Sequence, residues 1–225
     1  MSDKIRNPKV KVCCIQSVEE ANLAIQAGAS AIGLVSAMPS GPGVISDELI
    51  ATIAKKIPPG IETFLLTSKQ DVDDIIKQHN SCRTTTIQFV DTIPPEAYEI
   101  LHRELPQIKL VQVIHVTGQG SIEKAKRFAS YVDAILLDSG NPDLVIKELG
   151  GTGRTHNWDI SYEICRSVDT PVYLAGGLNP ENVTQAIEHV NPFGLDICSG
   201  LRTDGKLDKY KLTLFFDRIH HLIQS

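Results

Sequence analysis

The stretch PVYLAGGLNPENVTQAIEHVNPFGLDICSG, residues 171–200, contains one complete strand–helix–strand unit. Its two β-rich runs, Pro171–Gly177 and Gly194–Gly200, flank a segment whose apolar residues have helical spacing. Those residues are Val183, Ala186, Ile187 and Val190. Asn179 and Pro180 are typical of a helix N-cap and a first helical residue, so we expect the helix to start there. A strand, a helix and a second strand in this order predict a parallel sheet.

The same alternation extends outward to both ends of the chain. The predicted strands are Val10–Ile15, Ala31–Val35, Ile61–Thr67, Thr84–Val90, Lys109–Val116, Ala134–Ser139, Pro171–Gly177 and Gly194–Gly200. Further helices are expected near residues 46–57, 71–80, 94–105, 121–130 and 207–223. The first helix should begin at a capping box, Ser17–Glu20, and stop at Gly28.

Eight strand–helix pairs in 225 residues predict an α/β protein with the (β/α)8 TIM barrel fold. An open doubly wound sheet would more often have about five or six strands. No linker-like or low-complexity segment divides the chain. We therefore expect a single barrel domain over residues 1–225, with a short polar N-terminal tail at 1–8.

Composition excludes several classes of function. The chain has 22 Lys and Arg against 27 Asp and Glu, a net charge of −5, and no basic stripe, so no nucleic-acid partner is expected. It has neither a signal-peptide core nor a run of roughly 18 apolar residues, so we expect a cytoplasmic protein with no membrane partner. Five cysteines without a C-x-x-C pair, and histidines without H-x-H or H-E-x-x-H, predict reduced thiols and no metal site.

Two glycine-containing loops follow the last two predicted strands. In barrels these loops often bind phosphate, because glycines let backbone N–H groups approach the oxygens. Gly176 and Gly177 lie in the first loop, and Ser199 and Gly200 lie in the second. Either pair alone could simply make a tight turn, but both together favour a phosphorylated ligand.

A third glycine-rich loop, Gly150–Thr155, lies between the sixth and seventh predicted strands. It contains a cation but lacks the Walker A spacing, so it indicates either a lid or a phosphate contact. Asp138 closes the sixth strand, where a carboxylate would point into a barrel mouth. It is a candidate general acid or base, with a helix or loop cap as the alternative.

Strand alternation predicts that Lys11, Cys13 and Ile15 share the inward face of the first strand. A nearby ammonium stabilises a thiolate, which could then remove a proton. From this strand alone, a small buried apolar role for Cys13 is equally compatible and more common. On other strands, Asp196 could orient substrate hydroxyls, and Gln88 is expected to fill a polar barrel layer without a catalytic role.

Six segments in order along nearly the whole chain share the pattern of one family. They are Lys11–Cys13, Ala27–Gly33, Leu136–Ser139, Gly150–Thr155, Leu174–Val183 and Asp196–Gly200. Together they resemble phosphoribosylanthranilate isomerase of tryptophan biosynthesis. The runs at 150–155 and 175–183 are specific to that family, whereas the glycine segment at 28–33 is common in barrels.

The resemblance implies an aldose–ketose isomerase that needs no cofactor and no metal. Its reaction is an Amadori rearrangement of a phosphoribosyl amine to an aminodeoxyribulose phosphate. It implies that Asp138 is the general acid at the ribose ring oxygen and Cys13 the general base at C2′. The expected binding residues are Lys11, Gly151, Gly153, Arg154, Gly176, Gly177, Asp196, Ser199 and Gly200. The expected partner is a small phosphorylated substrate, and the expected assembly is a monomer or homodimer.

Four positions depart from the family pattern. Cys14 replaces a glycine, the loop at 36–43 lacks the family's arginine, Val90 replaces a histidine, and Gln112 stands where a lysine is usual. These departures concern the end that would hold the aromatic acid. They leave two alternatives open: an isomerase of another phosphosugar amine, or a protein that only binds a phosphorylated ligand. Retention of Cys13 and Asp138 favours an enzyme.

Overall fold

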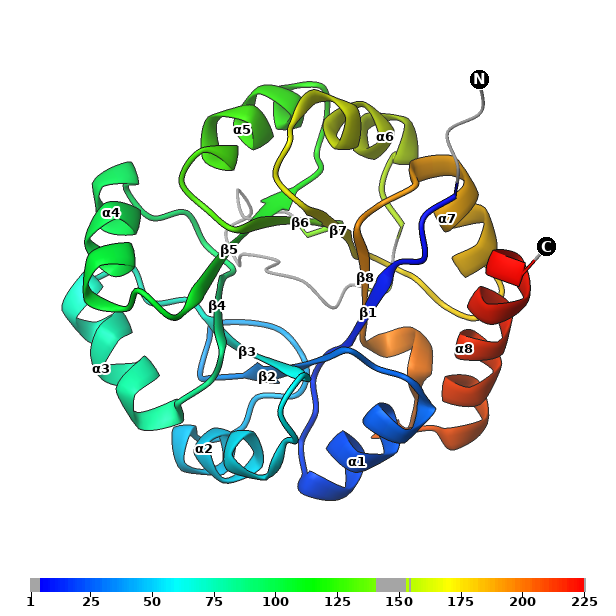
Figure 1. Ribbon diagram of the computed structural model, residues 1–225, viewed down its shortest axis with the longest axis horizontal. Coiled ribbons are helices and arrows are strands. Elements are labelled where there is room, and N and C mark those ends of the chain that lie inside the picture. The colour runs from blue at the N-terminus through cyan, green and yellow to red at the C-terminus, as the bar shows by residue number, and fades with distance from the viewer. Residues whose placement is uncertain (1–4, 141–152, 154, 225) are drawn as a thin grey trace.

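The computed structural model describes residues 5–140, 153 and 155–224. Eight parallel strands close into a barrel in sequence order, and the helices surround it (Figure 1). The strands are β1 (Lys9–Val12), β2 (Ala31–Val35), β3 (Glu62–Thr67), β4 (Thr86–Phe89), β5 (Lys109–His115), β6 (Ala134–Asp138), β7 (Val172–Leu174) and β8 (Gly194–Ile197). This architecture confirms the predicted TIM barrel.

In the described part of the chain, eight α-helices follow these strands. They are α1 (Val18–Ala27), α2 (Asp47–Lys56), α3 (Val72–Cys82), α4 (Pro95–Glu104), α5 (Gly120–Ala129), α6 (Trp158–Ser167), α7 (Val183–Val190) and α8 (Lys209–Gln224). The sequence pattern did not place α6, whose N-cap is the side chain of Asn157. Among the described residues, no helix is both long and apolar enough to cross a membrane.

Several strands end earlier than predicted, because the chain leaves the sheet to form the loops above the barrel. The predicted strand ends at Ile15, Gly177 and Gly200 are wrong by three residues each. At the first of these, Cys14 has a left-handed backbone with φ of 61°. A residue in that conformation cannot continue the pleat, so side-chain alternation stops after Cys13.

Local capping explains where two helices begin. Ser17 Oγ accepts a hydrogen bond from the Glu20 backbone N–H at 3.2 Å, which confirms the first half of the predicted capping box. The Glu20 carboxylate instead accepts from the backbone N–H of Gln16. The predicted start of α7 at Pro180 is wrong: the Asn179 side chain accepts from two backbone N–H groups in a turn, and the helix begins three residues later.

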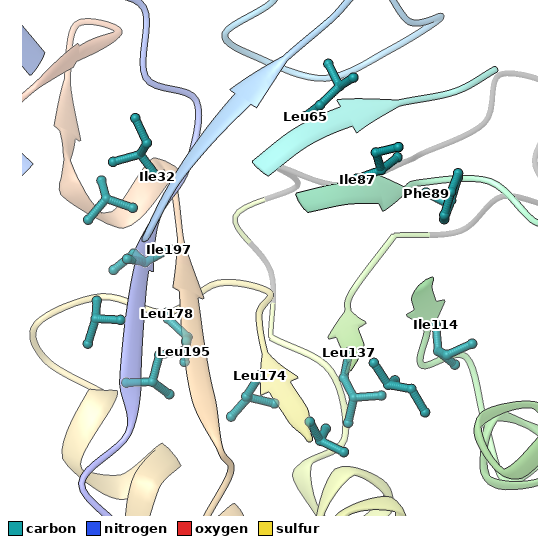
Figure 2. Packing of buried hydrophobic residues seen from close by; sticks show 14 of the residues in the cluster. Ile32, Leu65, Ile87, Phe89, Ile114, Leu137, Leu174, Leu178, Leu195 and Ile197 are labelled. Atoms are coloured by element: carbon teal, nitrogen blue, oxygen red, sulfur yellow. The ribbon is translucent and has the colours of Figure 1, made fainter. Parts of the chain in front are cut away.

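Buried apolar side chains form two layers. The outer layer lies between the strands and the helices, and Figure 2 shows part of it. It includes Ile32, Leu65, Ile87, Phe89, Ile114, Leu137, Leu174, Leu178, Leu195 and Ile197. The inner layer fills the barrel below its mouth, with Phe64, Val111, Leu136 and Tyr173 among its members. Each fully buried side chain of this size contributes roughly 1.5–3 kcal/mol, so the two layers together hold the strand ends in fixed positions.

A short hairpin joins β8 to α8. It consists of β9 (Arg202–Thr203) and β10 (Lys206–Leu207), after a single 3-10 turn at Ser199–Leu201. The Arg202 guanidinium forms an ion pair with Glu20 at 3.0 Å and donates to the carbonyl oxygen of Cys14. The hairpin therefore ties the loop after β8 to the turn after β1.

Candidate active site

A cavity opens at the C-terminal ends of the strands. Its position is where TIM barrels carry their chemistry. Side chains from β2, β3, β4, β6 and β8 and from several following loops form its wall. Among the described residues, no group of three or more His, Cys, Asp or Glu side chains is arranged to hold a metal ion.

Cys13 and Asp138 both line this cavity, as candidates for a general base and a general acid should. Cys13 is 5% exposed and Asp138 is 9% exposed. Burial raises the pKa of Asp138 to about 6, although its carboxylate accepts a hydrogen bond from the Ser139 backbone N–H at 2.7 Å. A carboxyl group with this pKa holds a proton far more readily than a surface aspartate, as a general acid must.

The thiol of Cys13 has the opposite tendency. A hydrogen bond from the Cys14 thiol and, more weakly, the ammonium of Lys11 hold the pKa of Cys13 below its ordinary value, although burial alone would raise it. The same hydrogen bond, together with one to Cys198, raises the pKa of Cys14 well above its ordinary value. Cys14 therefore remains a neutral donor beside a thiol that ionises readily.

Lys11 lies below the cavity wall and is fully buried. Its Nζ atom is 2.8 Å from Oδ1 of Asp196, and it lies 5.1 Å from the centre of the Phe64 ring. Burial opposes the charge on this ammonium, but Asp196 and the neighbouring thiols raise its pKa above the ordinary value. Asp196 lines the cavity, so the ion pair connects the barrel interior to the site.

The turn after β1 differs from its prediction. Cys14 lines the cavity beside Cys13, whereas Ile15 packs in the outer apolar layer. The prediction that Ile15 shares the inward face of Cys13 is therefore wrong. The left-handed conformation of Cys14 is the physical reason, and it explains why glycine is favourable at this position.

The remaining predicted binding residues surround one end of the cavity. Gly153, Gly176, Gly177 and Ser199 line it. Gly176 and Gly177 have φ values of 80° and 63°, which side chains rarely tolerate. Gly200 is not on the wall, but a Cβ there would lie 2.0 Å from the Leu178 carbonyl oxygen, so it lets two loops pack closely. Gly151 and Arg154 lie outside the described residues.

The opposite end of the cavity is mostly apolar. Val35, Met38, Leu66 and Val90 line it, and the amide of Gln88 lies among them. Within the described residues, no Lys or Arg lines any part of the cavity. Gln112 is not on this wall: its side chain points away from the barrel axis, and its Oε1 accepts a hydrogen bond from the hydroxyl of Tyr98 on α4.

Sequence reasoning placed Gln88 correctly inside the barrel but did not place it at the cavity wall. It also missed Cys14 as a wall residue. The sequence does contain a signal for Cys14. This residue stands where a glycine is usual, so its backbone is expected to adopt the left-handed conformation that glycine favours. No local signal marks Gln88, because its position at the wall depends on how strands distant in sequence pair.

The chain is similar to one family along most of its length. The sequence model of the N-(5'phosphoribosyl)anthranilate (PRA) isomerase family matches residues 10–218. N-(5'-phosphoribosyl)anthranilate isomerase 2 of Methanosarcina mazei is 38% identical over 212 residues, covering 93% of each chain. The isomerase of Methanocella arvoryzae is 32% identical, covering 92% of this chain and 95% of that protein.

Solved structures agree with these relatives. The phosphoribosyl anthranilate isomerase of Thermotoga maritima superposes with a TM-score of 0.82 at 26% identity, covering 95% of this chain and 99% of that one. A structure of such an isomerase bound to reduced 1-(o-carboxyphenylamino)-1-deoxyribulose 5-phosphate has a TM-score of 0.79 at 25% identity, with the same coverage. These matches do not favour a protein that only binds a phosphorylated ligand.

Proposed function

The chain belongs to the N-(5'-phosphoribosyl)anthranilate isomerase family, and we propose that Cys13 and Asp138 perform this family's Amadori rearrangement in tryptophan biosynthesis. The assignment of these two residues rests on one observation: they line the same cavity, and their pKa values are shifted in opposite directions. Burial raises the pKa of the carboxyl group, and hydrogen bonding lowers the pKa of the thiol. An acid and a base with such shifts are what a cofactor-independent isomerisation requires.

In the first step, Asp138 donates its proton to the ribose ring oxygen. The bond between that oxygen and C1′ breaks, and the nitrogen lone pair forms a C1′=N bond, which gives an open-chain iminium ion. Because burial raises the pKa of Asp138 to about 6, a larger share of this carboxyl group holds a proton near neutral pH than in a surface aspartate. The Asp138 carboxylate that remains is stabilised by the hydrogen bond from Ser139 N–H.

In the second step, the thiolate of Cys13 removes the proton at C2′. The electrons of that C–H bond form C1′=C2′, and the C1′=N electrons return to nitrogen, so that the charge on nitrogen disappears. The resulting enolamine takes up a proton at C1′ and loses one from its 2′-hydroxyl, which leaves a ketone at C2′. The sum of these steps is an isomerisation with no net gain or loss of electrons.

The phosphate of the substrate is assigned to the end of the cavity formed by Gly153, Gly176, Gly177 and Ser199. Backbone N–H groups and a hydroxyl are suitable donors for a phosphate, and glycine allows the oxygens to come close. Gly200 supports this end from behind. We propose that Gly151 and Arg154, which belong to the same glycine-rich loop as Gly153, also contribute to phosphate binding. Competition of inorganic phosphate with the substrate tests this assignment.

Lys11 and Asp196 are proposed to act as a pair. Asp196 would accept hydrogen bonds from the sugar hydroxyls, and Lys11 would keep it ionised and correctly oriented from below, at 2.8 Å. We further propose that the protein is a single barrel domain located in the cytoplasm. The reduced cysteines are compatible with that compartment.

The test is conversion of phosphoribosylanthranilate by the purified protein, followed as loss of the substrate's fluorescence. Cys13→Ala and Asp138→Asn should each lower kcat by about 10²- to 10⁴-fold, the usual contribution of a general acid or base. Cys165→Ala is the matched control, because that thiol lies on α6 away from the cavity. Turnover that survives both Cys13→Ala and Asp138→Asn would contradict the proposed roles.

A further inference from the structure

Two buried glutamines on neighbouring strands differ in their hydrogen bonding. Gln112 on β5 is fully buried, and its amide nitrogen donates to the carbonyl oxygen of Val113 at 2.8 Å, while its oxygen accepts from Tyr98. Gln88 on β4 is 3% exposed, and its Oε1 atom has no hydrogen-bond partner in the structure. A buried polar atom without a partner costs roughly 1–3 kcal/mol, so a fold has no reason to retain it for stability.

The position of Gln88 indicates where a partner would come from. Its side chain lines the cavity together with Leu66, its register partner on β3, and Val90, two residues further along the chain. In the barrel, β4 lies opposite β8 and three strands from β1, which precedes Cys13. A substrate whose phosphate lies beside the loops after β7 and β8 would pass Cys13 and Asp138 with its sugar and reach Gln88 with its aglycone.

The atom of the substrate that suits this oxygen is a hydrogen-bond donor. In an N-phosphoribosyl aromatic amine, the donor at the junction of sugar and aglycone is the amine N–H. We infer that Gln88 Oε1 accepts a hydrogen bond from this N–H and thereby stabilises the iminium ion. This inference rests on the proposed function, since it names an additional catalytic residue for the same reaction.

The electrostatic reason is specific to the first chemical step. When the bond between C1′ and the ring oxygen breaks, the nitrogen gains positive charge and its hydrogen becomes a stronger donor. A fixed amide oxygen then interacts more strongly with the iminium ion than with the bound substrate, which lowers the barrier and not only KM. No proton moves to Gln88, because the ring oxygen takes its proton from Asp138.

This role predicts opposite effects on activity and stability. Gln88→Leu removes the oxygen but keeps the volume, so kcat should fall by about 10- to 100-fold while KM changes much less. Removing a buried atom that has no partner should leave the melting temperature equal or higher. Gln88→Glu restores an acceptor at the same place and should recover part of the lost kcat.

Two matched variants separate catalysis from packing. Thr86→Val also removes a buried oxygen that lacks a partner, two residues earlier on the same strand, but Thr86 does not line the cavity. It should leave kcat unchanged. Gln112→Leu removes a glutamine that is fully bonded, so it should lower the melting temperature, unlike Gln88→Leu.

The experiment is steady-state kinetics and thermal unfolding of these four variants beside the unchanged protein. A large loss of kcat in Gln88→Leu, with no loss of stability and partial recovery in Gln88→Glu, is the expected result. If the unchanged protein is active and Gln88→Leu keeps kcat within about twofold, the inference is wrong and the proposed function stands. An unchanged protein that converts no N-phosphoribosyl amine would contradict the proposed function and the inference together.

Discussion

The two ends of the cavity are built in different ways. The end near β7 and β8 presents glycines, a serine hydroxyl and the carboxylate of Asp196, which pairs with the buried Lys11 behind the wall. The end near β2, β3 and β4 presents mostly apolar side chains, with the amide of Gln88 among them. The first end is suited to a phosphate, whose charge requires many donors. The second is suited to a flat aromatic group, whose orientation can be fixed by one hydrogen bond.

This difference also determines what can be inferred at each end. A phosphate site made of backbone groups needs glycines at fixed places in a loop, and such places are visible in the sequence. An apolar wall uses residues that occur throughout the core, so only the structure separates wall residues such as Leu66 from core residues such as Leu65.

The strongest test of the charged end is removal of one partner of its buried ion pair. Lys11→Met leaves Asp196 as an uncompensated carboxylate and should lower the free energy of unfolding by about 3–5 kcal/mol. Chemical denaturation at pH 7 measures this loss. The double variant Lys11→Met/Asp196→Leu should recover much of the stability, and a double variant as unstable as the single one would contradict the pair's proposed energetics.

Protonation of Asp138 gives the next largest effect. Its pKa rises from 3.8 to about 6 on folding, so its contribution to stability is fully present below pH 3.8 and lost as the pH rises through 6. At roughly 1.4 kcal/mol for each pKa unit, the cost at pH 7 is about 3 kcal/mol. Asp138→Asn should therefore raise the free energy of unfolding above that of the unchanged protein at pH 7. The same substitution should raise it much less at pH 4. An equal effect at both pH values would show that this carboxyl group titrates normally.

Gly176 tests the tight backbone of the phosphate end. An alanine at this position would lose about 1–2 kcal/mol of folding free energy because its backbone would be left-handed. Its Cβ would also lie only 3.0 Å from the Ser139 side chain. Gly205→Ala is a matched control, because its φ of 75° is similar but its Cβ would meet nothing within 4 Å. We expect Gly176→Ala to lose more stability and to raise KM, while Gly205→Ala leaves KM unchanged. Equal KM values in the two variants would contradict the position of the phosphate.

Cys14 lies at the centre, between the two ends. Cys14→Gly relieves a left-handed backbone that costs about 1–2 kcal/mol, so the variant should be more stable. It also removes the hydrogen bond that lowers the pKa of Cys13. The limb of the kcat/KM profile that reports ionisation of Cys13 should therefore move to higher pH, while two unmoved limbs would indicate that Cys14 does not tune the base. Cys82→Ala is a suitable control, because Cys82 is buried on α3 away from the cavity.

The smallest expected effect concerns the apolar end. Met38→Arg would place a cation on its wall, where it could pair with the carboxylate of anthranilate. A partly exposed pair of this kind contributes roughly 0.2–1 kcal/mol, so KM should fall a few-fold at most. Met38→Gln, which has similar length and no charge, should not show this change. If Met38→Arg lowers KM by the same factor for a substrate that lacks the carboxylate, the aglycone does not lie at this end.

Much of the fold followed from the sequence, because the strand and helix periods repeat regularly between glycine-marked turns. The errors lie at strand ends, such as Cys14, where one left-handed residue redirects the chain and reverses which side chains face inward. The start of α7 was also wrong, because Asn179 caps a turn and not the helix. The candidate acid and base followed from the family resemblance, while their opposite pKa shifts required the three-dimensional neighbours.

The roles of Cys13 and Asp138 are the central claim, and single-turnover conversion of substrate deuterated at C2′ tests them most directly. Under single-turnover conditions product release cannot hide the chemical step. We predict that the deuterated substrate reacts more slowly than the ordinary one, and that Cys13→Ala abolishes conversion of both. Equal rates for the two substrates, with conversion retained in Cys13→Ala, would contradict proton removal by this thiol.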